Sequence, residues 1–135
     1  MVDEDTRAFN RLMDAFSLPK KSEEEKKLRD IAIQEATKNA TLVPLKVMET
    51  AYPGFEMISE MVSKGNPNSI SDAGVGALAL RTCIRGAFLN VKINASGLND
   101  KDFVKDVIAR GEVLESKAEE AEQEILKKIN EKICT

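Results

Sequence analysis

Apolar residues recur along this chain mainly at helical spacing, three and four positions apart, and rarely in strict alternation. One face of a helix repeats about every 3.6 residues, whereas a half-buried strand repeats about every two. Short segments rich in proline, glycine, serine and asparagine separate the apolar stretches. The pattern predicts an all-α bundle of four or five helices, at about residues 3–16, 23–51, 55–64, 70–94 and 100–132.

Residues that favour helix ends mark several of these boundaries. Ser22 and Glu25 have the spacing of a capping box, in which each side chain accepts a hydrogen bond from the other residue's backbone N–H. Gly65 follows the third predicted helix, a position where glycine commonly ends a helix. Asn99 or Asp100 is placed to cap the last helix. Capping residues and apolar spacing therefore agree on the boundaries.

The second predicted helix contains a proline. Pro44 cannot donate the backbone hydrogen bond that the carbonyl of Ala40 would otherwise accept. Because a buried carbonyl needs a partner, we expect water or the side chain of Lys46 to supply one.

The fourth predicted helix carries a stripe of small and polar residues among many apolar ones. Glycine costs about 1 kcal/mol relative to alanine in a helix interior, so the glycines here indicate close approach by a neighbouring helix or a ligand. One interpretation is a buried core helix with a small-residue packing seam, and the other is that the polar members line a binding cleft. The stripe consists of Asp72, Gly76, Ala79, Cys83, Gly86, Asn90 and Asn94.

An acidic residue, Asp5, lies on the apolar face of the first predicted helix. A carboxylate on such a face costs free energy unless it is paired or functional. Alternatively, Asp5 is favoured only because it lies near the positive N-terminus of the helix. The apolar members of this face are Val2, Phe9, Leu12, Met13 and Phe16.

The loop over residues 66–68 precedes the fourth helix and is rich in amides. Asn66 and Asn68 could hold a polar ring by hydrogen bonds, or they could form a turn in which an Asx side chain bonds to the backbone. Ser69 or Ser71 can cap the helix, with Asp72 in its first turn.

Basic residues form a second stripe on the fourth helix, at Arg81, Arg85 and Lys92. These side chains could form an ordinary solvent-exposed face of the helix, or ion pairs with glutamates of the last helix. Alternatively, they could capture the anionic tail of a ligand.

Composition limits the possible chemistry. The chain has 135 residues, which suits a single domain over residues 1–135. Charged residues nearly balance, at a net charge of −3, so neither nucleic acid nor a membrane is predicted as a partner. Histidine is missing, which excludes Ser-His-Asp and Cys-His nucleophiles within one chain, and no metal site is predicted. With only two cysteines, Cys83 and Cys134, we expect a reducing, cytoplasmic setting and a core position for Cys83.

Three long segments are spread along residues 2–94: GNPNSISDAGVGALALRTCIRGAFLNVKIN, VDEDTRAFNRLMDAFSLPK and ATLVPLKVMETA. They closely resemble the cyclodeaminase/cyclohydrolase family of folate enzymes. The resemblance implies a tetrahydrofolate derivative as small-molecule substrate and no metal or redox cofactor. It also implies one of two reactions, closure of formiminotetrahydrofolate with loss of ammonia or hydrolysis of methenyltetrahydrofolate to formyltetrahydrofolate.

The resemblance favours functional roles for the polar residues named above. A carboxylate with a raised pKa can carry protons to or from nitrogen or water, and Asp72 and then Asp5 are the catalytic candidates. The predicted substrate-binding residues are Asn66, Asn68, Ser71, Arg81, Arg85, Asn90, Lys92 and Asn94.

Members of this family usually begin with a glycine-rich loop ahead of the region that resembles residues 2–5, whereas this chain starts at Met1. We therefore expect it to bind reduced folates but to turn them over weakly unless such a segment is restored. The alternative is a non-catalytic helical module for dimerisation or folate binding.

The last predicted helix is long enough to suggest a partner. At 1.5 Å per residue it would span about 50 Å, more than the diameter of a small domain. We expect part of it to pack on a second chain, so that the protein forms a homodimer or a higher homo-oligomer through its helices.

Overall fold

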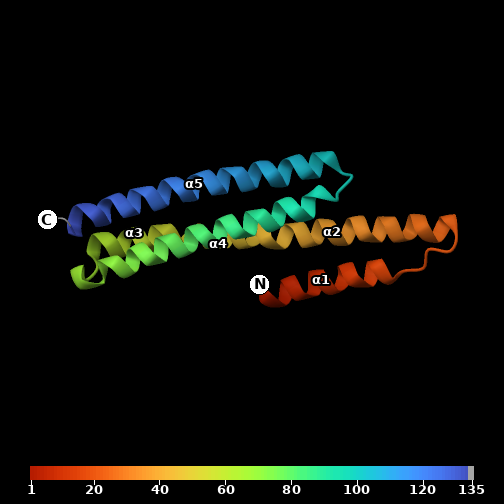
Figure 1. Ribbon diagram of the computed structural model, residues 1–135, viewed down its shortest axis with the longest axis horizontal. Helices are drawn as coiled ribbons and strands as arrows, with labels where there is room; N and C mark the ends of the chain where they lie inside the picture. The colour runs from red at the N-terminus through yellow and green to blue at the C-terminus, as the bar shows by residue number, and fades with distance from the viewer. Residues whose placement is uncertain (134–135) are drawn as a thin grey trace.

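Five α-helices make up most of residues 1–133, the part of the chain that the computed structural model describes (Figure 1). This part contains no strand, so the predicted all-α class is confirmed. None of its helices is both long and apolar enough to cross a membrane. The elements are α1 (Val2–Ser17), α2 (Glu23–Ala51), α3 (Gly54–Lys64), a short 3-10 turn (Pro67–Ser69), α4 (Ile70–Ser96) and α5 (Lys101–Ile133).

Local hydrogen bonds begin two of these helices as the sequence predicts. Glu25 N–H donates to Ser22 Oγ at 3.1 Å, and Ser22 N–H donates to the Glu25 carboxylate at 3.1 Å. The capping box of α2 is therefore confirmed. At the start of α5, Phe103 N–H donates to Asp100 Oδ1 at 3.1 Å, so Asp100 rather than Asn99 supplies the cap.

The core lies around α4, which packs against α2, α3 and α5. In Figure 1, α2 and α3 follow one another along one side of α4, and α5 runs along another side. Met48, Ile84, Phe88 and Val107 are at most 1% exposed, and each such side chain contributes about 1.5–3 kcal/mol by leaving water.

The length of α5 has an explanation within this chain. Its buried residues are spread along most of the helix, because α4 and α3 together cover one of its faces from end to end (Figure 1). The bundle is elongated, so a helix of this length does not need a second chain. The buried positions of α5 are Val107, Gly111, Ala118, Ile125 and Ile129.

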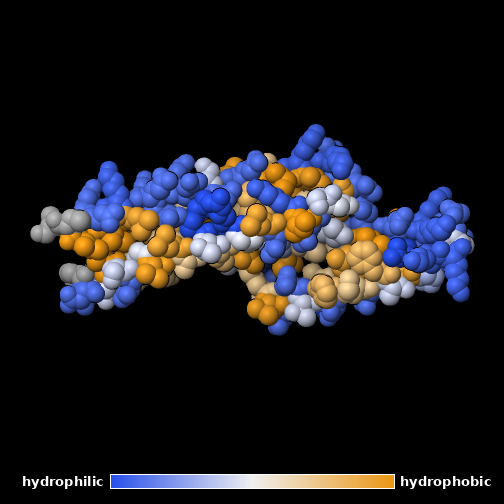
Figure 2. All heavy atoms as spheres, in the orientation of Figure 1, coloured by the Kyte–Doolittle hydropathy of each residue, from blue (hydrophilic) through white to orange (hydrophobic). Residues whose placement is uncertain are grey.

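The apolar face predicted on α1 is largely exposed. The buried residues of α1 are instead Ala8 and Ala15, because their small side chains allow the helix to approach α2 closely. Phe9 and Phe16 are 59% and 46% exposed, and Figure 2 shows apolar side chains gathered at the surface where α1 lies. The first helix therefore packs through its alanines and leaves its larger apolar residues in solvent.

The prediction that Cys83 is a core residue is wrong, because its thiol is exposed. α4 buries the face that carries Ala77, Ile84 and Val91, and Cys83 lies outside that face. The small-residue stripe is therefore not the central packing seam of the bundle. Much of it remains accessible, including Gly86 and Asn90.

Candidate functional site

A pocket opens where α1, α2 and α4 meet, and we call it the interhelical pocket. Its volume is about 420 Å³. It brings Asp5, one of the two predicted catalytic carboxylates, together with three members of the α4 stripe. The lining residues are Met1, Val2 and Asp5 from the α1 end, Val43, Pro44 and Val47 from α2, and Thr82, Cys83, Gly86, Ala87 and Asn90 from α4.

A few polar groups face mostly apolar walls in this pocket. Within residues 1–133, neither the Asp5 carboxylate nor the Asn90 side-chain amide has a hydrogen bond or ion pair, so both can bind a ligand. The hydroxyl of Thr82 donates to the carbonyl of Leu78 at 2.9 Å. Apolar walls with a few placed polar groups are typical of sites for small organic molecules. Nowhere in the described chain do three or more Asp, Glu or Cys side chains gather as metal ligands would.

A hydrogen bond between α2 and α4 holds one wall of the pocket in place. Because Pro44 has no N–H, the carbonyl of Ala40 accepts a hydrogen bond from Asn94 Nδ2 at 3.0 Å. The sequence predicted water or Lys46 as this partner, and the structure corrects that prediction. Asn94 was predicted to bind substrate, and this hydrogen bond shows that its side-chain amide contacts α2.

An ion pair holds α1 against α2 beside the pocket. Lys46 Nζ donates to both carboxylate oxygens of Glu4, at 2.9 and 3.1 Å. This hydrogen bond and the charge of Lys46 hold the pKa of the Glu4 carboxyl below its ordinary value. Glu4 is thereby kept ionised, and α1 is held where Asp5 can face α4.

The other predicted carboxylate, Asp72, lies elsewhere on α4. It is exposed in the first turn of the helix, eleven residues before Cys83, which is about 16 Å along the helix axis. Ser71 is exposed beside it, and the side chain of Ser69, the N-cap residue before Ile70, makes no capping hydrogen bond. These residues lie at the N-terminal end of α4, whereas the pocket lies against its middle and C-terminal half.

The amide-rich loop over residues 66–68 forms the Asx turn, which was the alternative to ligand binding by its asparagines. Asn68 N–H donates to the side-chain oxygen of Asn66 at 3.0 Å, which is an Asx turn. Both residues are exposed, and neither lines the interhelical pocket.

The basic stripe of α4 is mostly occupied by contacts within the chain. Arg81 is buried and lies 3.7, 3.3 and 3.5 Å from the carboxylates of Glu115, Glu119 and Glu122 on α5. Arg85 pairs with Glu115 at 3.6 Å. The ammonium of Lys92 lies 4.0 Å from the ring centre of Phe88, at cation–π distance. The ion-pair interpretation therefore fits Arg81 and Arg85.

Fold and pocket together define an all-α protein with an interhelical pocket suited to a small organic molecule. The chain belongs to the formiminotransferase-cyclodeaminase family, whose family model matches residues 1–113. This confirms the resemblance that the sequence segments indicated.

Individual relatives span both named activities of the family. A methenyltetrahydrofolate cyclohydrolase from Methylorubrum extorquens is 38% identical over 133 residues, which are 98% of this chain and 64% of the relative. The mouse formimidoyltransferase-cyclodeaminase is 40% identical over 103 residues, which are 76% of this chain and 19% of that protein. The crystal structure of a formiminotetrahydrofolate cyclodeaminase from Thermotoga maritima matches with a TM-score of 0.80 at 25% identity, covering 96% of this chain and 61% of that one. The chain thus spans less than two thirds of the length of each of these relatives.

Proposed function

We propose that this protein acts in folate one-carbon metabolism, in the cytoplasm, and binds a tetrahydrofolate derivative in the interhelical pocket. The observation that carries the proposal is the meeting of Asp5 from α1 and Asn90 from α4 in one largely apolar pocket. The apolar walls suit a flat heterocyclic ring, and the free carboxylate and amide suit its polar edge. Family membership supports the same substrate class.

Two related reactions fit this assignment. In a cyclodeaminase reaction, a ring nitrogen attacks the formimino carbon and ammonia leaves. In a cyclohydrolase reaction, water adds to the methenyl carbon and one carbon–nitrogen bond opens. Both pass through a tetrahedral carbon bonded to two nitrogens and need protons moved to or from nitrogen or water. Asp5 is the carboxylate that lines the pocket and would carry these protons.

The role of Asp5 is tested by comparing two matched carboxylate-to-amide variants. Asp5→Asn should keep the fold and folate binding but reduce methenyltetrahydrofolate hydrolysis, or ammonia release from formiminotetrahydrofolate, by roughly two to four orders of magnitude. Asp72→Asn changes a carboxylate outside the pocket and should stay within a few-fold of the parent. Turnover by Asp5→Asn at the parental rate would remove Asp5 from the mechanism.

The second candidate function is folate binding without turnover. It is favoured by the exposure of Asp5, since proton transfer is most effective where a site excludes water. Calorimetric titration with formyltetrahydrofolate beside the turnover assay separates the two functions. Saturable binding without detectable turnover identifies a binding module, and turnover identifies an enzyme.

We also propose that the protein forms a homodimer through α4. Val75, Leu78, Leu89 and Ile93 lie along one exposed stripe of this helix and are between 46% and 68% exposed. They form two apolar patches, one on each side of Thr82 and Gly86, and exposed apolar patches are typical of an interaction site. Sedimentation at micromolar concentration should show a dimer that Leu89→Lys dissociates and that Leu28→Lys, at an exposed apolar position on α2, does not. A compact monomer would contradict this proposal.

A further inference from the structure

A further cavity lies where the start of α3 meets the C-terminal half of α5, and we call it the aromatic groove. Its volume is about 340 Å³, and it shares no lining residue with the interhelical pocket. Of the described residues that line it, two are aromatic, two are acidic and none is basic. This composition differs from that of the interhelical pocket, which has one carboxylate and no aromatic ring in its described lining.

Helical spacing explains why these residues share one groove. A tight turn joins α2 to α3, in which Phe55 N–H donates to the carbonyl of Tyr52 at 3.1 Å. The lining residues of this segment recur three and four positions apart, and so do those of α5, so one side of each segment faces the groove. They include Tyr52, Phe55, Glu56 and Ser59 on one wall and Glu124 and Ile125 on the other.

The buried members of the lining are apolar or aromatic. Phe55 and Ile125 are 4% and 2% exposed, whereas Tyr52 is partly exposed. The ring centres of Tyr52 and Phe55 lie 6.1 Å apart, and the ring planes are tilted by 57°. An accessible aromatic ring attracts a cation over its face and also covers methylene groups. Tyr52 can therefore contact both the charge and the alkyl chain of an organic cation.

Two carboxylates at the groove lack a cationic partner. Glu56 on α3 and Glu124 on α5 are exposed, and within residues 1–133 neither carboxylate has a hydrogen bond or ion pair. Lys128 lies one turn beyond Glu124 but does not line the groove. The lining therefore carries two uncompensated negative charges beside aromatic surface. An alkylammonium ion fits both features, because its charge pairs with a carboxylate and its methylene groups cover the ring.

We propose that the aromatic groove binds an aliphatic diamine or polyamine. Its ammonium groups pair with Glu56 and Glu124, and its methylene groups lie against Tyr52. Because the two carboxylates come from different helices, a ligand with two ammonium groups can pair with both, whereas a monoamine can pair with only one. The site is separate from the interhelical pocket, so it binds an amine whether or not that pocket binds a folate.

The direct test is a calorimetric titration of the purified protein with spermidine at low ionic strength. The parent should bind it saturably, and Glu56→Gln/Glu124→Gln should bind it about tenfold more weakly, because both charge-assisted hydrogen bonds are lost. Glu112→Gln/Glu120→Gln is the matched control. It removes the same charge from exposed positions of α5 outside the groove and should bind like the parent.

Two further arms test the aromatic ring and the second carboxylate separately. Tyr52→Leu keeps an apolar side chain but removes the ring, and it should weaken spermidine binding several-fold while circular dichroism shows an intact fold. The parent should bind 1,4-diaminobutane more tightly than butylamine, and the Glu56→Gln/Glu124→Gln variant should lose this preference.

Three results would overturn the proposal. The first is the absence of saturable spermidine binding by the parent. The second is equal binding by the parent and by Glu56→Gln/Glu124→Gln. The third is an equal loss in Glu112→Gln/Glu120→Gln, which would show that spermidine responds only to the overall negative charge of the protein.

Discussion

Single glycines on α4 and α5 have opposite structural roles. At Gly111 a Cβ atom would collide with the ring of Phe88, so α5 can pack this closely on α4 only because the side chain is absent. At Gly86 a Cβ atom would meet nothing within 4 Å, and this glycine lines the interhelical pocket. The first glycine serves packing, whereas the second leaves space for a ligand.

Alanine substitutions at these two glycines should therefore change stability in opposite directions. Gly111→Ala should lower the free energy of unfolding by about 1–2 kcal/mol, because overpacking outweighs the helix preference of alanine. Gly86→Ala should raise it by up to about 1 kcal/mol and weaken ligand binding by filling the pocket. Urea denaturation of both variants checks this, and a loss of stability at Gly86→Ala would show that the position is not open.

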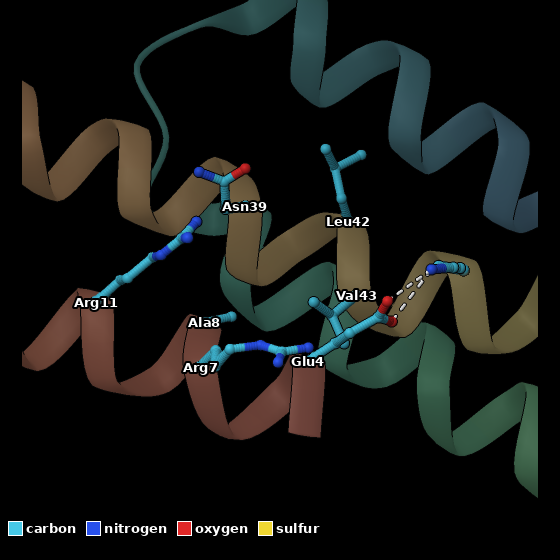
Figure 3. A pocket seen from close by; sticks show the side chains of 8 residues that line it. Glu4, Arg7, Ala8, Arg11, Asn39, Leu42 and Val43 are labelled. Carbon is cyan, nitrogen blue, oxygen red and sulfur yellow. Dashed lines mark hydrogen bonds and ion pairs between the residues drawn. The ribbon is translucent and has the colours of Figure 1, made fainter. Parts of the chain in front are cut away.

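Individual polar residues were only partly predictable from the sequence. Asp5 could be singled out because an acid on an apolar face is anomalous whatever the helix packs against. The burial of Arg81 could not be predicted from the sequence, because it depends on three glutamates of α5 that lie at least 34 positions away. Arg7 and Arg11 could not be singled out either, because only the packing of α1 on α2 places them along one groove with Asn39 (Figure 3).

At the scale of helices, the pair of α2 and α4 depends on a proline and an asparagine. Pro44 leaves the Ala40 carbonyl without its usual donor, and Asn94 supplies one from the neighbouring helix. Leaving a buried acceptor unsatisfied costs about 1–3 kcal/mol. The contact therefore specifies how α2 and α4 are aligned beside the pocket.

A double-mutant cycle tests this coupling. Asn94→Ala should destabilise the protein by about 1–3 kcal/mol, because the carbonyl of Ala40 loses its donor. In a Pro44→Ala background the restored N–H can satisfy that carbonyl, so the same change should cost at least about 0.5 kcal/mol less. Equal losses of stability in the two backgrounds would show that the two residues act independently.

Helices were predictable where their signals are local. The capping box of α2 involves residues three positions apart, so its sequence pattern and its structure coincide. The docking of α1 depends on tertiary contacts instead: the apolar face of the sequence suggested large residues as the contact, but the alanines allow the closer approach. The same limit explains Cys83, which the pattern placed in the core and the structure places in the pocket wall.

At the scale of the whole molecule, α1 contributes to two cavities. One side of it closes the interhelical pocket against α4, and Arg7 and Arg11 on another side line a groove against α2. The α4 stripe suggested a binding cleft, but no sequence pattern reports where α1 docks, so the part of the pocket that α1 forms could not be predicted. Our main proposal for the molecule is that a reduced folate binds in the interhelical pocket.

The exposed thiol of Cys83 measures occupancy of that pocket directly. In a Cys134→Ser background the alkylation rate of Cys83 is followed with and without formyltetrahydrofolate. At a ligand concentration ten times the dissociation constant, we predict that the alkylation rate falls about tenfold and that protection follows the binding curve. A rate that stays unchanged while calorimetry shows the protein saturated with ligand would contradict it, because the folate would then be bound elsewhere.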